Sequence, residues 1–326
     1  MDIKAKIPSI SKQIYKEDIE QILLTNFSLI GGDWISNQLA WAHEAFKVFK
    51  DHEKYLMIIY LVKKTLDWYS KNFTKISYDT FFSKKELEIG KFNIVEISNF
   101  LKIPKETVRR KIIELEKVGV IKRIRKKIIL DKTLFLFMKP INSTKRIASF
   151  LSKVSRLLKK QNILLDAYSS NNLHKYICED FSYSWKLFYQ LQLPLVVNWK
   201  SFFKDLETWH IWATCIYNKS LSQEVKSSNL EYKDFVKKMI HEFNGLGLSA
   251  MSISDITGIP RPTVVRKLRL LMKKKHLVID KKKLYHPHGG DYKEMIEVHQ
   301  GNIKLLSIFV ADMFNQYSYF TDKKID

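Results

Sequence analysis

The chain has 326 residues and a formal net charge of +22, from 56 Lys and Arg against 34 Asp and Glu. At about 150 residues per domain, this length predicts two domains that can each bury a core. Two cysteines are too few for a disulfide scaffold. The longest strongly apolar run, residues 55–62, is far shorter than the roughly 20 residues that span a bilayer, and the first ten residues lack the apolar core of a secretory signal. We therefore expect a cytoplasmic protein with no membrane partner.

The chain repeats itself. Residues 49–55 (FKDHEKY) match residues 203–209 (FKDLETW) at an offset of 154, and both lead into apolar helical stretches. Residues 94–121 then match residues 250–277 at a constant offset of 156. An amphipathic stretch follows each copy, which places Ile147 opposite Ile303. Because a self-match at fixed spacing over a whole supersecondary unit is typical of duplication, each half is predicted to contain a helix, a helix-turn-helix, a hairpin and a further helix.

The first repeated segment has the pattern of a helix-turn-helix. Asn93 is suited to cap the first helix, Ile103 to fill the turn, and Pro104 to begin the second helix, where its missing N–H costs nothing. Gly119 follows as a left-handed cap, and two short strands then enclose a basic tip. The residues predicted to face inward are Ile97, Phe100, Leu101, Val108, Ile112 and Leu115. The outward residues predicted to bind DNA are Lys105, Thr107, Arg109 and Arg110 on the second helix and Arg125, Lys126 and Lys127 on the wing.

The second copy repeats this construction, with Ile253, Ile256, Val264, Leu268 and Leu271 predicted to face inward. Its candidate DNA-binding residues are Arg261, Thr263, Arg266 and Arg269 on the second helix and Lys281, Lys282 and Lys283 on the wing. The outward positions differ between the copies, since Arg109 aligns with Val265, Glu106 with Pro262, and Ile113 with Arg269.

The excess charge is concentrated in these two segments. Residues 102–133 carry a net charge of +8 and residues 261–284 one of +9, which leaves the rest of the chain nearly neutral. A solvated helix face explains one run of lysines equally well. Here the charge falls twice on the second helix and hairpin, the parts that face DNA in helix-turn-helix proteins, and this favours nucleic-acid binding.

Residues 97–121 and 253–278 resemble the winged helix-turn-helix of bacterial transcription regulators, particularly the MarR-type and Crp/Fnr-type modules. The resemblance covers roughly fifty residues in each half and identifies a module that many regulators share. It implies that the second helix of each copy enters the major groove, with Thr107 and Thr263 near phosphates and with Arg110 and Arg266 at base edges or phosphates. It also implies that the wings lie along the flanking backbone.

The copies depart from the module at two turns. Lys102 stands where Gly258 keeps the usual glycine, and Lys275 stands where the first copy has Gly119. A lysine in left-handed conformation costs on the order of 1 kcal/mol. Neither departure excludes the fold.

The predicted fold is mainly α with small β-hairpin wings, built from two winged helix-turn-helix units flanked by helices in an internal pseudo-two-fold duplication. Residues 1–160 would hold a helical region, the first winged unit (about 90–134) and a following helix. A helical connector is predicted at 161–198, and residues 199–326 would hold the second helical region, the second winged unit (about 248–288) and a C-terminal helix.

These features predict a sequence-specific double-stranded DNA-binding protein, a transcriptional regulator that acts as a single-chain pseudo-dimer on two unequal half-sites. RNA polymerase and a second copy of the chain are further candidate partners, and the nucleoid is the expected location. Two alternatives stay open: a plasmid- or phage-type replication initiator with two winged-helix domains, and an architectural protein that binds nucleic acid without sequence preference.

Other patterns carry less weight. The loose cluster of His286, His288, Asp291, Glu294 and His299 lacks a metal-ligand framework, and no phosphate-binding glycine loop or catalytic constellation occurs. We therefore expect no enzyme activity, no cofactor and no metal. Aromatic residues could line an effector pocket, although their helical spacing is more typical of a core; they are Phe202, Phe203, Trp209, Trp212 and Tyr217.

Overall fold

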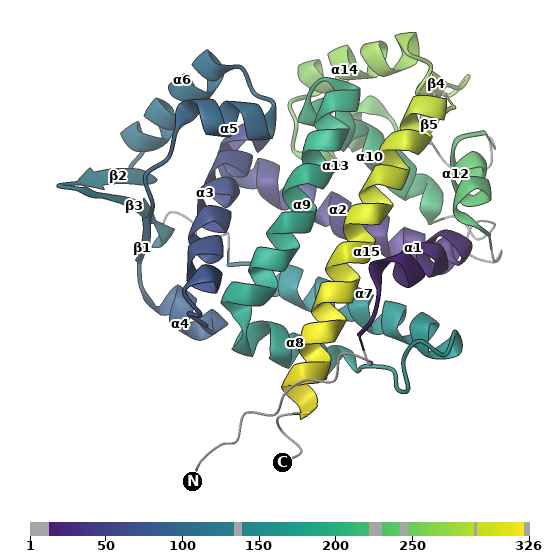
Figure 1. Cartoon of the computed structure of the whole chain (residues 1–326). Coiled ribbons are helices and arrows are strands. Elements are labelled where there is room, and N and C mark those ends of the chain that lie inside the picture. The colour runs from purple at the N-terminus through teal and green to yellow at the C-terminus, as the bar shows by residue number, and fades with distance from the viewer. Residues whose placement is uncertain (1–12, 134–138, 222–229, 242–246, 290–291, 323–326) are drawn as a thin grey trace.

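The structure is a computed structural model that describes residues 13–133, 139–221, 230–241, 247–289 and 292–322. It is mainly helical, with one three-stranded and one two-stranded antiparallel sheet (Figure 1). The prediction of a mainly α chain with small β-hairpins is thus confirmed. Within the described ranges, no helix is both long and apolar enough to cross a membrane.

The first half, residues 16–160, contains seven helices and three strands within the described residues. Its elements are α1 (Lys16–Thr25), α2 (Phe27–Phe49), α3 (His52–Lys71), α4 (Tyr78–Ser83), β1 (Glu86–Ile89), α5 (Ile94–Leu101), α6 (Lys105–Lys117), β2 (Ile121–Ile124), β3 (Lys127–Asp131) and α7 (Ile141–Lys160). Strand β3 lies between β1 and β2 in the sheet.

The second half, residues 170–322, has a closely similar order. Its elements are α8 (Ser170–Glu179), α9 (Phe181–Phe203), α10 (Leu206–Ser220), α12 (Tyr232–His241), α13 (Ala250–Thr257), α14 (Arg261–Lys273), β4 (Leu277–Ile279), β5 (Tyr285–Pro287) and α15 (Tyr292–Asp322). A single bridge between Leu248 and Tyr285 extends the β4–β5 pair. Four helices have the same length as their partner 154 or 156 residues earlier: α8 and α1, α9 and α2, α13 and α5, α14 and α6.

The two halves are interleaved through one continuous hydrophobic core. Helix α3 packs on α9 and α10 packs on α2, so each long helix contacts the opposite half. Helix α1 lies along α15, just as α8 lies along α7, and the short helices cross over in the same way, α4 onto α9 and α12 onto α2 (Figure 1). The halves therefore bury their apolar faces against each other.

Residues 161–198 were predicted to connect two separate regions, and this part of the interpretation needs correction. They are helical, but they form α8 and most of α9, and most side chains of α9 are buried. The link between the halves is only the short segment 161–169. The sequence of α9 has diverged from that of α2, which concealed their common length and position.

One hydrogen-bonded pair marks the centre of this arrangement. Gln38 of α2 and Gln192 of α9 are 154 residues apart, and each buried amide donates to the carbonyl oxygen of the other, at 3.1 and 3.0 Å. Corresponding residues contact each other reciprocally where they face across a two-fold axis. This geometry is what an approximate two-fold axis between α2 and α9 would produce.

The two lysines that stand in place of turn glycines have the same backbone conformation as the glycines of the other unit. Lys102 has φ 51° where Gly258 has φ 68°, and Lys275 has φ 57° where Gly119 has φ 78°. The Lys102 turn receives support from the other half, because the buried Lys200 ammonium donates to the Lys102 carbonyl oxygen at 2.8 Å. Both lysines thus adopt the left-handed conformation that the glycines adopt without strain.

The inward residues are predicted correctly with two exceptions. Phe100 is 39% exposed and Ile256 is 47% exposed, although both were assigned to the buried stripe of the first helix. Each lies on an eight-residue helix, in which only the side facing the next helix is covered. Phe100 keeps one aromatic contact, with the ring of Tyr60 at 5.0 Å between centroids.

Candidate nucleic-acid interface

The first basic unit, residues 94–131, and the second basic unit, residues 250–287, are built by the same local bonds. The first helix of each is capped by a polar side chain, Asn93 or Ser249, which accepts a backbone N–H. The turn is then closed by a serine, since the Ser98 hydroxyl donates to the Ile103 carbonyl at 2.7 Å and Ser254 donates to that of Ile259 at 2.8 Å. A small hydroxyl residue therefore fixes the angle between the two helices in both units.

A largely buried lysine side chain anchors each second helix to the core. Lys267 of α14 forms an ion pair with Asp205 at 2.6 Å, and Lys111 of α6 forms the corresponding pair with Asp51. The two lysine side chains are only 12% and 11% exposed. Because each aspartate also caps a long helix, α10 or α3, the position of the second helix is tied to that helix. We call this arrangement the aspartate clamp.

The electrostatics of the clamp follow from its burial. Desolvation would raise the pKa of Asp51, but the hydrogen bond and charge of Lys111 outweigh it, so the pKa is lowered. Neighbouring acids complete each clamp, Glu53 at 3.4 Å from Lys111 and Glu207 at 3.9 Å from Lys267. Both lysines were predicted only to add to the basic charge, and the clamp was not predicted, although its aspartates lie in the FKD sequence repeated at residues 49–51 and 203–205.

The structure places most predicted DNA-binding residues on the surface. Helices α6 and α14 lie at the same end of the molecule, at the top of the view (Figure 1). Thr107 and Thr263 are half-buried at the start of these helices. The exposed candidates are Lys105, Arg109, Arg110, Arg125, Lys126, Lys127, Arg261, Arg266, Arg269, Lys281, Lys282 and Lys283.

The charges on the two second helices are balanced differently. On α6, Arg109 forms an ion pair with Glu106 at 3.2 Å, and Arg110 lies 3.8 Å from Glu114. Helix α14 contains no acidic residue, and its three exposed arginines form no ion pair with any other described residue. The surface of α14 is therefore the more strongly cationic.

The wings differ in the same sense. In the first, Lys127 pairs with Glu88 of β1 at 2.8 Å, and Arg125 adopts a left-handed conformation in the turn. In the second, Asp280 is used inside the turn, where it accepts the N–H groups of Lys282 and Leu284 at 2.9 Å. Lys281, Lys282 and Lys283 thus remain exposed around it.

The histidines near the second wing do not gather into one site. His286 faces Asp280 at 3.0 Å, while His288 lies 2.9 Å from the carbonyl oxygen of Lys275. His299 packs edge-on against Trp199, and Asp291 lies outside the described residues. Within those residues no group of three or more His, Cys, Asp or Glu is placed to hold a metal ion.

Neither a family model, nor a curated protein, nor a solved structure matches this chain. What the molecule does must therefore be inferred from its own residues and their geometry.

Proposed function

We propose that the chain is a sequence-specific DNA-binding protein, a transcriptional regulator in which two winged helix-turn-helix units of one duplicated chain act as a covalent pseudo-dimer. Both basic units have the same pair of helices, the same serine-closed turn and the same aspartate clamp. The framework that the two units share carries different outward residues, as expected of two surfaces that contact different bases.

The observation that carries the proposal is the combination of the clamps with the Gln38–Gln192 pair. An approximate two-fold axis at that pair relates the two units, and duplex DNA has two-fold axes of its own. Dimeric helix-turn-helix proteins use this match to place two helices in successive major grooves, about 34 Å or roughly 10 base pairs apart. The same spacing is expected between α6 and α14.

In this arrangement, α6 and α14 enter the major groove. Arg110 and Arg266, which occupy corresponding positions, contact base edges or phosphates, and Thr107 and Thr263 contact phosphates at the helix starts. The basic wing tips lie along the flanking backbone. Because Arg109, Glu106 and Ile113 have no counterpart of the same type in the second unit, the two half-sites are related but unequal.

The test is equilibrium binding to duplex DNA over a range of salt concentrations. If each unit neutralises about four phosphates, the logarithm of the affinity falls against the logarithm of salt with a slope near −7. A preferred site, once selected, should outcompete random duplex by roughly a thousandfold or more. A flat salt response would exclude DNA binding by these surfaces, and equal competition by random duplex would reduce the proposal to non-specific binding.

A further inference from the structure

A large cavity lies between α2, α3, α7 and α9 in the first half, and its volume is about 540 Å³. A cavity of this size can enclose a small organic ligand. Its buried side is aromatic, and its exposed edge is basic. The aromatic residues that line it are Trp41, Tyr55, Trp185, Phe188 and Tyr189, and the lysines are Lys47, Lys50 and Lys139.

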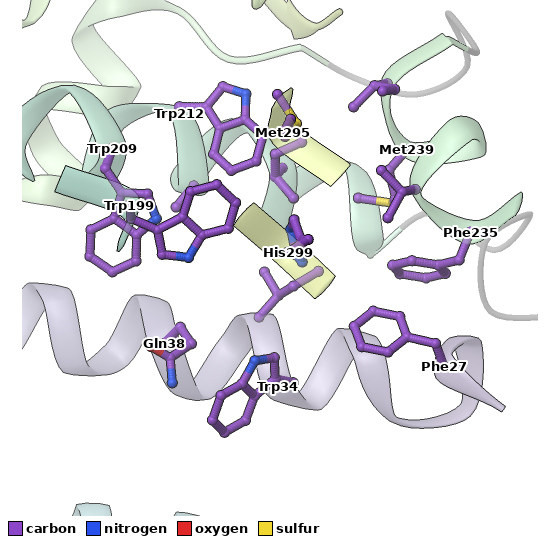
Figure 2. A pocket seen from close by; sticks show the side chains of 15 residues that line it. Phe27, Trp34, Gln38, Trp199, Trp209, Trp212, Phe235, Met239, Met295 and His299 are labelled. Atoms are coloured by element: carbon purple, nitrogen blue, oxygen red, sulfur yellow. The ribbon is translucent and has the colours of Figure 1, made fainter. Parts of the chain in front are cut away.

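The corresponding space of the second half is nearly filled, with a volume of only about 60 Å³ (Figure 2). This is less than a single aromatic ring needs. Of the five aromatic residues that the sequence offered for an effector pocket, Trp209 and Trp212 line this small space, whereas Phe202, Phe203 and Tyr217 line neither space. Residues at corresponding positions in the two spaces are Phe188 and Trp34, Tyr189 and Ile35, Tyr55 and Trp209, Lys139 and Met295, and Ser143 and His299.

Side-chain size and helix length explain why only the first half keeps this space. Trp199 of the second half stands at the position of Ala45 in the first. Likewise, His299 stands at the position of Ser143. Helix α12 also runs for ten residues and contributes Met239 to the filled space, whereas α4 begins at the corresponding position and ends after six residues. The large cavity is therefore a property of one half and not of the repeated fold.

Lysine side chains give the cavity an uncompensated positive edge. Lys47 and Lys139 are exposed, and neither forms an ion pair with another described residue. The ammonium of Lys50 lies over an aromatic ring of α2, 5.6 Å from its centre. The one acid among the described lining residues, Glu44, is already paired with Arg146 at 2.9 Å. The residues that correspond to Lys47 and Lys139 in the second half are uncharged, so these cations occur only where the cavity is large.

Further cations surround Lys139. A small adjoining space, which shares Trp185 and Tyr189 with the cavity, is lined by Lys132. Burial, reinforced by the charges of Lys139 and Lys84, lowers the pKa of Lys132 to about 8. The charged forms of these lysines therefore repel one another. A bound anion would reduce that repulsion, because an opposite charge nearby favours the charged form of a lysine.

We propose that this cavity is a binding site for a small phosphate monoester that carries a flat aromatic ring. The ring packs against the aromatic side of the cavity, and the phosphate lies at the edge, where Lys47 and Lys139 compensate its charge. A phosphate monoester has a charge of about −1.5 to −2 at neutral pH, which two ammonium groups balance, and lysine binds phosphate as a point charge. A neutral ring would leave both lysines uncompensated.

Tyr55 supplies a polar group inside the cavity. Its side chain is buried, and its hydroxyl forms no hydrogen bond with another described residue, so it is free to bind the ester oxygen of the ligand. The site does not depend on DNA binding by the basic units, and its test requires no nucleic acid.

The probe is phenyl phosphate, followed by ¹⁹F NMR of the full chain labelled with 5-fluorotryptophan. Trp41 and Trp185 line the cavity, whereas Trp209 and Trp212 line the filled space of the second half and serve as internal controls. The probe should shift the Trp41 and Trp185 signals saturably and leave the controls unchanged. Phenol and inorganic phosphate should each bind at least about tenfold more weakly, because one lacks the charge and the other the ring. Unchanged Trp41 and Trp185 signals, or equally tight binding of either part alone, would overturn the proposal.

Substitutions taken from the second half locate the phosphate. Lys47→Ser and Lys139→Met together introduce the residues that the second half has at these positions. They should weaken phenyl phosphate binding by about tenfold or more, since two charge-assisted contacts are lost, and leave phenol binding unchanged. The control, Lys71→Ala with Lys160→Ala, removes the same charge from exposed lysines that do not line the cavity and should leave binding intact. Equal losses in the two variants, or a loss in neither, would contradict the assigned site.

Discussion

The two basic units share a framework and differ in surface charge. Helices α6 and α14 each carry five basic residues, but α6 also carries three acids, of which Glu106 and Glu114 lie beside Arg109 and Arg110. Helix α14 carries none. The serine that closes the turn and the clamp lysine are the same in both units, and the stripe on the second helix is apolar and buried in both. The comparison teaches that the framework is fixed by buried contacts, while the outward face can change in charge without altering the fold.

The largest effect expected from this difference concerns DNA affinity. Replacing Arg261, Arg266 and Arg269 together by alanine should weaken binding by about a thousandfold and reduce the salt slope by about 3, because none of the three is ion-paired to another described residue. The matched variant replaces Lys105, Arg109 and Arg110. It should lose only about thirtyfold, since two of these side chains already neutralise acids. Fluorescence anisotropy at several salt concentrations measures both, and equal losses would remove the distinction between the units.

Acidification should destabilise the contact between the two halves, where three histidines meet. His43 Nδ1 lies 2.7 Å from His210 Nε2, and His210 Nδ1 lies 3.2 Å from His52 Nε2. Burial lowers the pKa of His52 to about 4, against the attraction of Asp51 and Asp205. The unfolded chain binds protons at this residue near pH 6.5. Its contribution to stability is therefore complete above about pH 6.5 and is lost as the pH falls toward 4, by ~3 kcal/mol in total.

The assignment of this pH dependence to His52 is tested by replacing it with the residue found at the corresponding position of the second half. Leu206 occupies the position that corresponds to His52, so His52→Leu should make the free energy of unfolding less dependent on pH between about 6.5 and 4.5. Urea denaturation across that range measures it. An unchanged pH dependence would show that the histidine contacts between α3 and α10 are not the acid-sensitive element.

Loss of either clamp aspartate should lower the stability of the protein by a similar amount, whereas substitutions of the outward charges should have unequal effects in the two units. Asp51→Ala and Asp205→Ala each remove a helix cap and one partner of a buried lysine, and each should lower the free energy of unfolding by ~2 kcal/mol. Asp51→Asn and Asp205→Asn retain the cap and separate the two contributions. If one alanine variant is strongly destabilised and the other unaffected, the clamps are not equivalent.

The smallest expected effect concerns the ion pair between Arg109 and Glu106 on α6. Glu106→Gln releases Arg109 and should raise DNA affinity about threefold with a slightly steeper salt slope. Asp255→Asn is the control, because Asp255 is an exposed acid of the second unit without an ion pair in the described residues. A gain from both substitutions would indicate a general effect of net charge.

Local patterns predicted the framework well. The caps, the turn residues and the stripes formed by Val108, Ile112 and Leu115 are as expected, because neighbouring residues and helical spacing determine them. Phe100 and Ile256 were misassigned because an apolar residue on a short helix gives no sign of which neighbour covers it. The role of Lys111 could not be predicted, because its partner Asp51 is 60 positions away. Nothing in the local sequence distinguishes a buried lysine from an exposed one.

The arrangement of the halves was harder to predict. The match at residues 49–55 and 203–209 was visible, but α9 and α2 share length and position with little sequence, so 161–198 was taken for a connector. The Gln38–Gln192 pair depends on two helices from opposite halves, whose residues are 154 positions apart. No local pattern carries that information.

The central claim is that two unequal units read one DNA site, and selection of bound sequences from a random duplex pool tests it most directly. The wild-type chain should enrich two related, unequal half-sites about 10 base pairs apart. Arg110→Ala should relax one half and Arg266→Ala the other. A strictly palindromic motif, relaxation of the same half by both variants, or no enriched sequence at all would contradict the account.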